Sequence, residues 1–384
     1  MKRKVSGLVV AGLTGVILTC ARGEQPEPRE SALTSQQRTQ AEESLRKGLN
    51  WLAAGQSKDG SWSDRGVPAL TGLPLWAFAR TDHPHRDAIV SNAVRYLRGC
   101  VQPDGGIYKP TFLTGGLTTY NTAVCMTALH ALGDPTLTPI VLKARTFMAD
   151  SQIESGDDTD GGFGYSRTTH FVHADLQNTA MAMQAMRLTA GVEDSRPKGE
   201  TRADLDWKRT VAFIERLQNK ASAGEEHAGG MTYAAGGSIF GSSKAKDGTV
   251  VLRSSGTMTY AGLLSMIYAD MARDDHRVRS AFDWATRHWT LDENPGVGPS
   301  GLYFYYHVMS RALCAFGADS IPVKDRGSVN WRAEYVARLV AAQRKDDAPD
   351  QGFWVNKDSN RFWEGNPVLV TAYCIMGLQS AMGR

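Results

Sequence analysis

The stretch Gln56–Trp62, QSKDGSW, follows the apolar run LRKGLNWLAAG and indicates how the whole chain is organised. Similar turns recur along the sequence, as in QPDGGIY from Gln102 and QRKDDAPDQGFW from Gln343. Six units with a period of roughly 50 to 60 residues cover the chain from about residue 40 to its end. A repeat of this length is typical of an architecture in which each unit is one small set of packed elements.

Each unit is predicted to contain two helices of different character. In the first helix of the first unit, Leu45, Leu49 and Leu52 recur at helical spacing, while charged residues occupy the other side. The second helix of a unit is apolar nearly all round, as in TAMAMQAM from Thr179, so it must be buried on both sides. Six such pairs form two concentric rings with the buried helices inside. The predicted fold is an all-α (α/α)6 toroid, which closes on itself and leaves no exposed end to cap.

The repeated turn has a structural interpretation. Its glycine permits the positive φ that ends the first helix of a unit. The aromatic residue packs beneath the turn against the neighbouring unit, and the glutamine amide hydrogen-bonds backbone groups left free at helix ends. No catalytic role is assigned to the turn.

Composition excludes little but supports a large core. The 384 residues are 42% hydrophobic and 22% charged, with a net charge of +3. This is ordinary globular composition. The near-neutral balance gives no support to nucleic-acid binding, which requires a basic face or stripe.

The N-terminus has the pattern of an export signal. A basic MKRK precedes the apolar VSGLVVAGLTGVILT, which is shorter than a membrane-spanning helix and diluted by glycine and threonine. Residues 17–20, ILTC, resemble a bacterial lipoprotein box, in which Cys20 is lipidated; cleavage after Ala21 by an ordinary signal peptidase is the alternative. We therefore expect an exported protein, either periplasmic or anchored to the cell envelope through Cys20. No other membrane contact is predicted.

The predicted domain boundaries follow from these segments. Residues 1–20 form the signal peptide and residues 21–37 a polar, proline-bearing tether. Residues 38–384 form a single toroid domain, with a loop insertion at about 236–254.

The first unit, KGLNWLAAGQSKDGSW, resembles the QW repeat of the squalene–hopene cyclase and protein prenyltransferase β-subunit superfamily, that is, of the terpenoid cyclases. The stretches TMTYAGLLSMIYA, LDENPGVG, GLYFYYHVM and WEGNPVLVTAY resemble bacterial prenyltransferase/squalene-oxidase-repeat proteins. The resemblance covers the whole predicted domain. It implies a toroid that binds an apolar, isoprenoid-like ligand in its central cavity. Fold alone does not fix a reaction.

The resemblance also implies an acid that this chain lacks. Cyclases of this superfamily protonate their substrate with a DxDD motif, whereas Asp157–Asp160 reads DDTD and lies in the turn of the third unit. The equivalent turns of other units are acidic as well, so we interpret this segment as a solvated turn. A calcium site is the alternative, because carboxylates and carbonyls in turns suit that ion.

Prenyltransferases of the superfamily hold zinc through an aspartate, a cysteine and a histidine. The segment Leu369–Leu378, LVTAYCIMGL, fits the frame of the stretch that carries their histidine, but Val370 occupies the histidine position. No Asp-x-Cys precedes a predicted inner helix. Neither a metal nor a cofactor is predicted.

The parallel inner helices direct their N-termini to one mouth of the toroid, where backbone N–H groups and positive dipole ends converge. Polar and aromatic residues at this mouth are the candidate site. The catalytic candidates are His307, Asp175 and Glu364. The ligand-binding candidates are Tyr120, Asn121, His173, Asn178, Arg253, Tyr260, Tyr303, Tyr306, Trp363 and Asn366.

His307 is the most suggestive candidate because aligned units carry Ala123 and Ala180 at this position. A histidine on a buried helix needs a partner, and Asp175 or Glu364 could form an acid–base pair with it across the cavity. The alternatives are a core histidine bonded to a tyrosine and, for Asp175, a helix N-cap.

Three functions remain open. The leading one is an exported toroid that binds an apolar, possibly isoprenoid, ligand. The second is a carbohydrate-active (α/α)6 enzyme, which would need an open cleft with paired carboxylates. The third is a non-catalytic binding or scaffold protein of the cell envelope.

Overall fold

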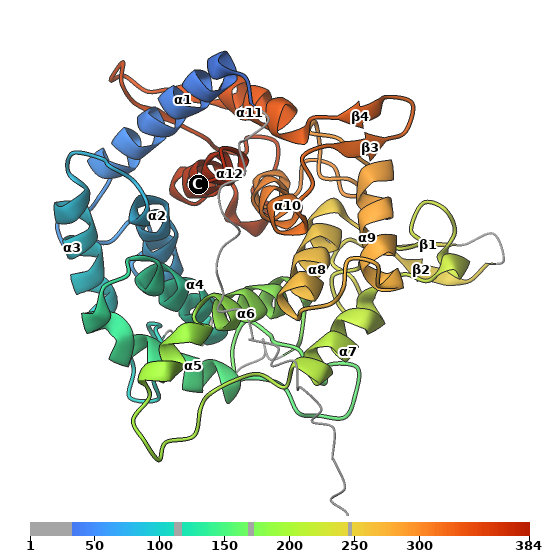
Figure 1. Ribbon diagram of the computed structural model, residues 1–384, viewed down its shortest axis with the longest axis horizontal. Coiled ribbons are helices and arrows are strands. Elements are labelled where there is room, and N and C mark those ends of the chain that lie inside the picture. Colours follow the sequence, from blue (N-terminus) through green and yellow to red (C-terminus); the bar gives the residue numbers. More distant parts are fainter. Residues whose placement is uncertain (1–32, 111–116, 168–172, 245–247) are drawn as a thin grey trace, which may run out of the picture.

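The computed structural model describes residues 33–110, 117–167, 173–244 and 248–384. Within these ranges twelve α-helices form two concentric rings (Figure 1). The outer ring consists of α1 (Ser35–Ala54), α3 (Arg86–Arg98), α5 (Thr138–Ala149), α7 (Trp207–Leu217), α9 (His276–Arg287) and α11 (Trp331–Ala342). The inner ring consists of α2 (Ala69–Ala79), α4 (Thr118–Ala131), α6 (Leu176–Leu188), α8 (Gly256–Tyr268), α10 (Leu302–Phe316) and α12 (Pro367–Ala381).

The inner ring is closed. Each inner helix packs against the next in chain order, and α12 returns to pack against α2. In the outer ring the last helix lies beside the first, because α11 contacts α1. The predicted (α/α)6 toroid is therefore confirmed.

Short elements connect the helices. They are the 3-10 helices η1 (Pro135–Leu137), η2 (Ala190–Ser195), η3 (Ala221–Ala223) and η4 (Arg361–Trp363), and the strands β1 (Ser242–Lys244), β2 (Val250–Leu252), β3 (Ile321–Val323), β4 (Gly327–Val329), β5 (Arg344–Lys345) and β6 (Gly352–Phe353). The strands pair in three antiparallel hairpins, β1–β2, β3–β4 and β5–β6. The predicted insertion at about 236–254 contains the β1–β2 hairpin, which projects from the outside of the ring (Figure 1).

The first helix begins at Ser35, earlier than the predicted domain start at residue 38. The reason is a capping box: the Thr34 hydroxyl accepts a hydrogen bond from the Gln37 backbone, and the Gln37 side chain accepts one from the Thr34 backbone. Cys20 and the predicted export signal lie outside the described residues, so their roles stay predictions.

The glycine of the repeated turn lets one outer helix approach the next. Gly60, Gly105, Gly161 and Gly229 all have a positive φ, as predicted. A Cβ built on Gly60 would lie 2.1 Å from the Asn92 carbonyl oxygen of α3. The other three glycines meet a backbone carbonyl of α5, α7 and α9 in the same way, at 2.6, 2.3 and 2.4 Å. A side chain at these positions would push the turn away from the next outer helix.

The glutamine of the turn links the same pair of units. The Gln56 amide donates to the Gly60 carbonyl in its own turn and to the Ile89 carbonyl of α3. Gln152 and Gln218 make equivalent bonds toward α7 and α9. Gln343 donates to the Ser44 carbonyl of α1 at 2.8 Å, which joins the last outer helix to the first.

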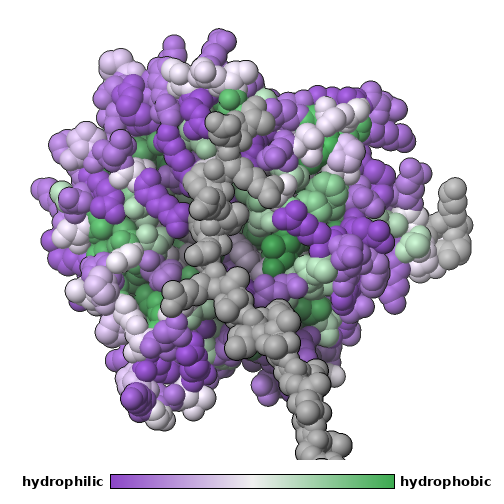
Figure 2. All heavy atoms as spheres, in the orientation of Figure 1, coloured by the Kyte–Doolittle hydropathy of each residue, from purple (hydrophilic) through white to green (hydrophobic). Residues whose placement is uncertain are grey.

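Hydrophobic residues concentrate toward the middle of the ring. In the space-filling view, hydrophilic residues occupy most of the periphery and hydrophobic ones lie closer to the centre (Figure 2). Cys100, Cys125, Cys314 and Cys374 are all free thiols. No helix of the described part of the chain combines the length and the apolar character that crossing a membrane requires.

Candidate functional site

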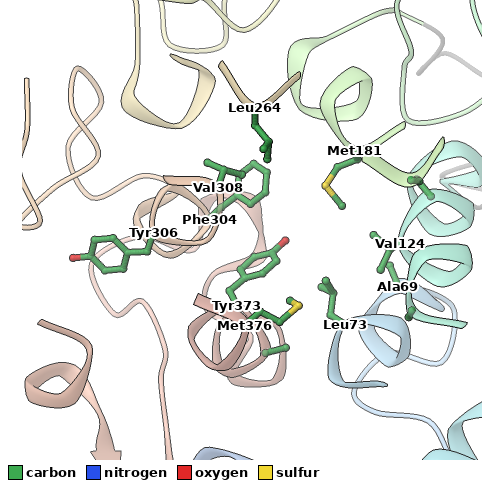
Figure 3. Close-up of a cluster of buried hydrophobic side chains, with 14 of the residues drawn as sticks. Ala69, Leu73, Val124, Met181, Leu264, Phe304, Tyr306, Val308, Tyr373 and Met376 are labelled. Carbon is green, nitrogen blue, oxygen red and sulfur yellow. The ribbon is translucent and has the colours of Figure 1, made fainter. Parts of the chain in front are cut away.

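The inner helices present a stripe of apolar side chains to the axis of the ring. Leu73 of α2, Val124 of α4, Met181 of α6, Leu264 of α8, Val308 of α10 and Met376 of α12 all point toward this axis (Figure 3). Residues three or four positions apart share one helix face, so the stripe continues along each helix. We call the space that these side chains surround the lumen.

Several side chains of this stripe keep a small exposed fraction although they lie in the centre of the molecule. Met181, Val308 and Met376 keep 6%, 5% and 4% of their surface exposed. Leu264 keeps 4%, whereas Leu73 and Val124 keep none. A water-sized molecule can therefore contact four of these six apolar side chains.

One helical turn further toward the C-terminal ends of the inner helices, the lumen becomes polar. Trp76 follows Leu73, Gln184 follows Met181, and Arg311 follows Val308 by three residues each. The Arg311 guanidinium lies over the Trp76 ring, 4.6 Å from its centroid, and donates to the Tyr268 hydroxyl at 3.3 Å. The sequence prediction missed this layer.

Asp175 belongs to a buried polar network at the opposite, N-terminal mouth. Its carboxylate caps α6 by accepting hydrogen bonds from the backbone and side-chain amides of Asn178, at 2.8 and 2.7 Å. Tyr233 and Tyr165 lie close to the same carboxylate. Burial raises the pKa of Asp175 to about 6, although these hydrogen bonds act in the opposite direction.

Glu364 also caps a helix. It is fully buried, and its carboxylate accepts a hydrogen bond from the Phe304 backbone in the first turn of α10 at 2.8 Å and one from the Asn356 amide at 2.7 Å. The N-terminus of a helix favours a negative charge at this place. Burial nevertheless raises the pKa of Glu364 to about 7.

This raised pKa predicts a pH dependence of stability. Between about pH 4.5 and 7 the folded protein keeps a proton on Glu364 that the unfolded chain has lost, so the contribution of Glu364 to stability falls as the pH rises through this window. Urea unfolding of the wild type and of Glu364→Gln at about pH 5 and about pH 8 measures it. The stability of the wild type relative to the variant should be lower at the higher pH. A relative stability that rises with pH would contradict the prediction.

His307 lies in an aromatic stack. Its ring is parallel to that of Tyr373 at 4.9 Å and meets Trp76 edge-on at 6.5 Å. The side chain is 1% exposed, and its Nδ1 atom has no hydrogen-bond partner among the described residues. Burial, with a smaller effect of Arg311, holds the pKa of His307 well below its ordinary value, so the ring is neutral.

The structure does not bring the three catalytic candidates together. Within the described ranges no hydrogen bond or ion pair joins His307 to Asp175 or Glu364. The predicted acid–base pair is therefore wrong in its geometry, because each carboxylate is engaged at the start of a helix while the imidazole packs between aromatic rings. The alternative interpretation of Asp175 as an N-cap describes its contacts.

Two aromatic candidates connect the mouth to the lumen. The Tyr120 hydroxyl lies 3.5 Å from that of Tyr373, which points toward the axis (Figure 3). Tyr260 is buried against Tyr305, and its hydroxyl has no partner in the described part of the chain. Of the two, Tyr120 is linked to a side chain that points toward the axis.

Other ligand-binding candidates serve the scaffold. Asn121 is buried and accepts a hydrogen bond from the Ala69 backbone at the start of α2. Asn366 caps α12 through the backbone of Val368. Tyr306 points away from the axis (Figure 3) and donates to the Leu291 carbonyl, and Tyr303 packs edge-on against its ring.

The remaining candidates are exposed. His173 and Arg253 lie on the surface, the latter just after β2. Trp363 is 45% exposed in η4 and has a positive φ of 63°. None of the three lies in the lumen stripe.

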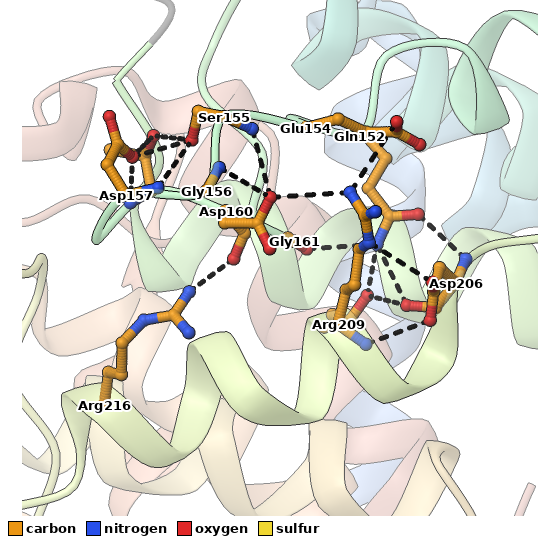
Figure 4. Close-up of polar contacts among 12 residues, drawn as sticks. Gln152, Glu154, Ser155, Gly156, Asp157, Asp160, Gly161, Asp206, Arg209 and Arg216 are labelled. Carbon is orange, nitrogen blue, oxygen red and sulfur yellow. Dashed lines mark hydrogen bonds and ion pairs between the residues drawn. The ribbon is translucent and has the colours of Figure 1, made fainter.

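The acidic segment Asp157–Asp160 forms a closed turn (Figure 4). Asp157 accepts hydrogen bonds from the Ser155 hydroxyl at 2.7 Å and the Thr159 backbone at 2.8 Å, and Asp160 contacts Arg209 of α7. The hydrogen bonds from Thr159 and Ser155 lower the pKa of Asp157 to about 2. An acid that protonates a substrate must carry a proton, so these contacts favour the predicted role as a solvated turn. In the described ranges no group of three or more His, Cys, Asp or Glu side chains could hold a metal ion.

Comparison with known proteins identifies the fold but not a reaction. No family model and no curated protein sequence matches the chain. The type II terpene cyclase MstE from Scytonema is similar in structure, with a TM-score of 0.55 and 14% identity over 90% of this chain and 99% of the cyclase. The cellobiose 2-epimerase from Spirochaeta thermophila has a TM-score of 0.54 and 13% identity over 90% of this chain and 96% of the epimerase.

A third similar structure is a variant of the same Scytonema cyclase in complex with geranylgeranyl dihydroxybenzoate. Its TM-score is 0.52, with 13% identity over 91% of this chain and 99% of that chain. At these identities the similarities show a shared (α/α)6 fold alone.

Proposed function

We propose that this protein binds an apolar, isoprenoid-like molecule in the lumen of the toroid. The observation that carries the proposal is the stripe of apolar side chains that points toward the axis: Met181, Leu264, Val308 and Met376 keep some exposed surface there, and Leu73 and Val124 pack beside them without any. Binding pockets for such molecules are lined mostly by apolar groups, with a few polar ones that fix orientation. The complex of the Scytonema cyclase with a geranylgeranyl compound supports the ability of this fold to enclose such a molecule.

The carbohydrate alternative has less support. A sugar enzyme needs carboxylates that face its substrate. Asp175 and Glu364 are instead held in the caps of α6 and α10. The similarity to the cellobiose epimerase concerns the fold and brings no sugar-binding residue with it.

A larger side chain in the lumen should weaken the binding of an isoprenoid ligand. Val308→Trp places a large ring in the axial space and should weaken binding of geranylgeraniol by at least about tenfold, with Val308→Phe intermediate. Isothermal titration calorimetry with geranylgeraniol measures this. Val250→Trp is the matched control, because Val250 is 65% exposed on β2 and remote from the stripe.

Two outcomes would contradict the proposed function. One is a wild type that binds cellobiose and not geranylgeraniol, which would favour the carbohydrate alternative. The other is unchanged geranylgeraniol binding in folded Val308→Trp and Val308→Phe, with folding checked by circular dichroism. The predicted export and lipidation at Cys20 are independent of both outcomes.

A further inference from the structure

The polar end of the lumen contains a cation without a carboxylate partner. Arg311 makes no ion pair with any acidic residue of the described chain, and its Nε atom is buried without a hydrogen-bond acceptor. Nearby Arg187 differs, because it pairs with Asp270. A guanidinium carries five N–H donors; Arg311 is half-buried and uses one of them on Tyr268, and a buried Nε–H without an acceptor is unfavourable.

Two further polar atoms without a partner lie in or next to this layer. Gln184 is 4% exposed, and its Nε2 donor has no acceptor in the described part of the chain. His307 lies one helical turn before Arg311 on α10, beside Val308 of the apolar stripe, and its Nδ1 atom is also unpartnered there. Gln184 and Arg311 each follow a residue of the apolar stripe by three positions, which places both about one helical turn beyond it.

The helix ends near Arg311 supply partial negative charge but no carboxylate. Arg311 lies five residues before Phe316, the end of α10, and its guanidinium contacts Trp76 and Tyr268 in the last turns of α2 and α8. The contacts that Arg311 does make, to the Trp76 ring and the Tyr268 hydroxyl, bring no negative charge. The layer thus offers one positive charge and several N–H donors next to an apolar channel.

We propose that Arg311 and Gln184 of this layer, with His307 one helical turn away, bind the carboxylate of a long-chain apolar acid whose hydrocarbon tail occupies the lumen. This site rests on the proposed function and specifies the class of its ligand. A guanidinium matches the planar carboxylate with two parallel hydrogen bonds. One guanidinium balances the single charge of a carboxylate, whereas a phosphate monoester carries about −1.5 to −2 and would leave buried charge uncompensated.

The experiment compares ligands that share one tail. Geranylgeranoic acid, geranylgeraniol and geranylgeranyl monophosphate are titrated into the wild type, Arg311→Met and Arg187→Met by calorimetry. The wild type should bind the acid at least about tenfold more tightly than the alcohol and more tightly than the monophosphate. Arg311→Met should lose the preference for the acid and keep its affinity for the alcohol within about threefold, which also shows that the variant is folded.

Arg187→Met is the control, and the results that would overturn the carboxylate site differ from those that would overturn the proposed function. Arg187→Met should keep the preference of the wild type, because Arg187 already has a carboxylate partner. Equal affinity of the wild type for acid and alcohol, an unchanged preference in Arg311→Met, or tighter binding of the monophosphate would overturn the carboxylate site alone. Failure of the wild type to bind any of the three compounds would overturn the proposed function as well.

Discussion

Replacing Arg145 by leucine is expected to lower the free energy of unfolding by about 3–5 kcal/mol. Arg145 lies on the outer helix α5 and is 1% exposed. Its guanidinium bonds to the Glu193 carboxylate at 2.8 Å, to the Met186 carbonyl at 2.6 Å and to the Ala203 carbonyl at 2.7 Å. One side chain thus ties α5 to the end of α6, to η2 and to the segment before α7.

The loss of stability is expected to be large because Arg145→Leu leaves buried acceptors without a donor. Leucine cannot bond any of these acceptors, so two buried carbonyls lose their donors and Glu193 keeps only Arg196 as a charged partner. Removing one member of a buried ion pair is far more costly than removing an exposed one.

Urea unfolding monitored by circular dichroism measures the change, with Arg202→Leu as the control. Arg202 pairs with Asp194 of the same η2 region, but both side chains are mostly exposed, at 61% and 72%. The control should cost less than about 1 kcal/mol. Equal costs for the two variants would contradict a structural role of the Arg145 network.

Gly161→Ala is expected to cost roughly 2–4 kcal/mol of stability, the second largest effect. Gly161 has a φ of 82°, and an alanine Cβ would lie 2.3 Å from the Arg209 carbonyl oxygen of α7. The variant therefore adds backbone strain and also pushes α7 away from the turn that Figure 4 shows.

Gly156→Ala, in the same turn, separates these two causes. Gly156 also has a positive φ, of 72°, but no atom lies within 4 Å of the added Cβ. The control should show only the strain of a left-handed alanine, about 1–2 kcal/mol. Thermal and urea unfolding of both variants give the comparison. Equal losses of stability in the two variants would contradict the idea that Gly161 is needed for the close approach of its turn to α7.

The fold could be predicted because its signals are local and repeated. The apolar stripe of Leu45, Leu49 and Leu52 and the glycine turn recur from unit to unit, and repetition with alternating one-sided and buried helices leaves few architectures open. The close approach of Gly60 to Asn92 could not be predicted, because it depends on where the next outer helix lies.

The candidate site was predicted less well, for a physical reason. Inner helices are apolar on every side, so periodicity cannot separate the face toward the axis from the face toward the outer ring. Val308 and Met309 are both apolar neighbours in the sequence, and nothing in the sequence shows that Val308 points toward the axis. The sequence did contain a signal for Gln184 and Arg311, because both are polar residues within apolar helical runs. A buried polar side chain normally has a hydrogen-bond partner, so such residues are candidates for contacts with a ligand.

The sequence also does not show which carboxylates are engaged in helix caps and which could contact a substrate. Asp175 and Glu364 were candidates by residue type and position near the mouth. Their engagement in caps follows from distances to Asn178 and Phe304 that only the folded chain defines.

The closure of α1 onto the end of the chain constrains how the protein can fold during synthesis. Gly48 of α1 packs against Trp354 and Ile375, and the helix contacts α11, α12 and β6. The apolar face of α1 therefore stays uncovered until the residues of α11, β6 and α12, some 300 positions later in the chain, have been synthesised.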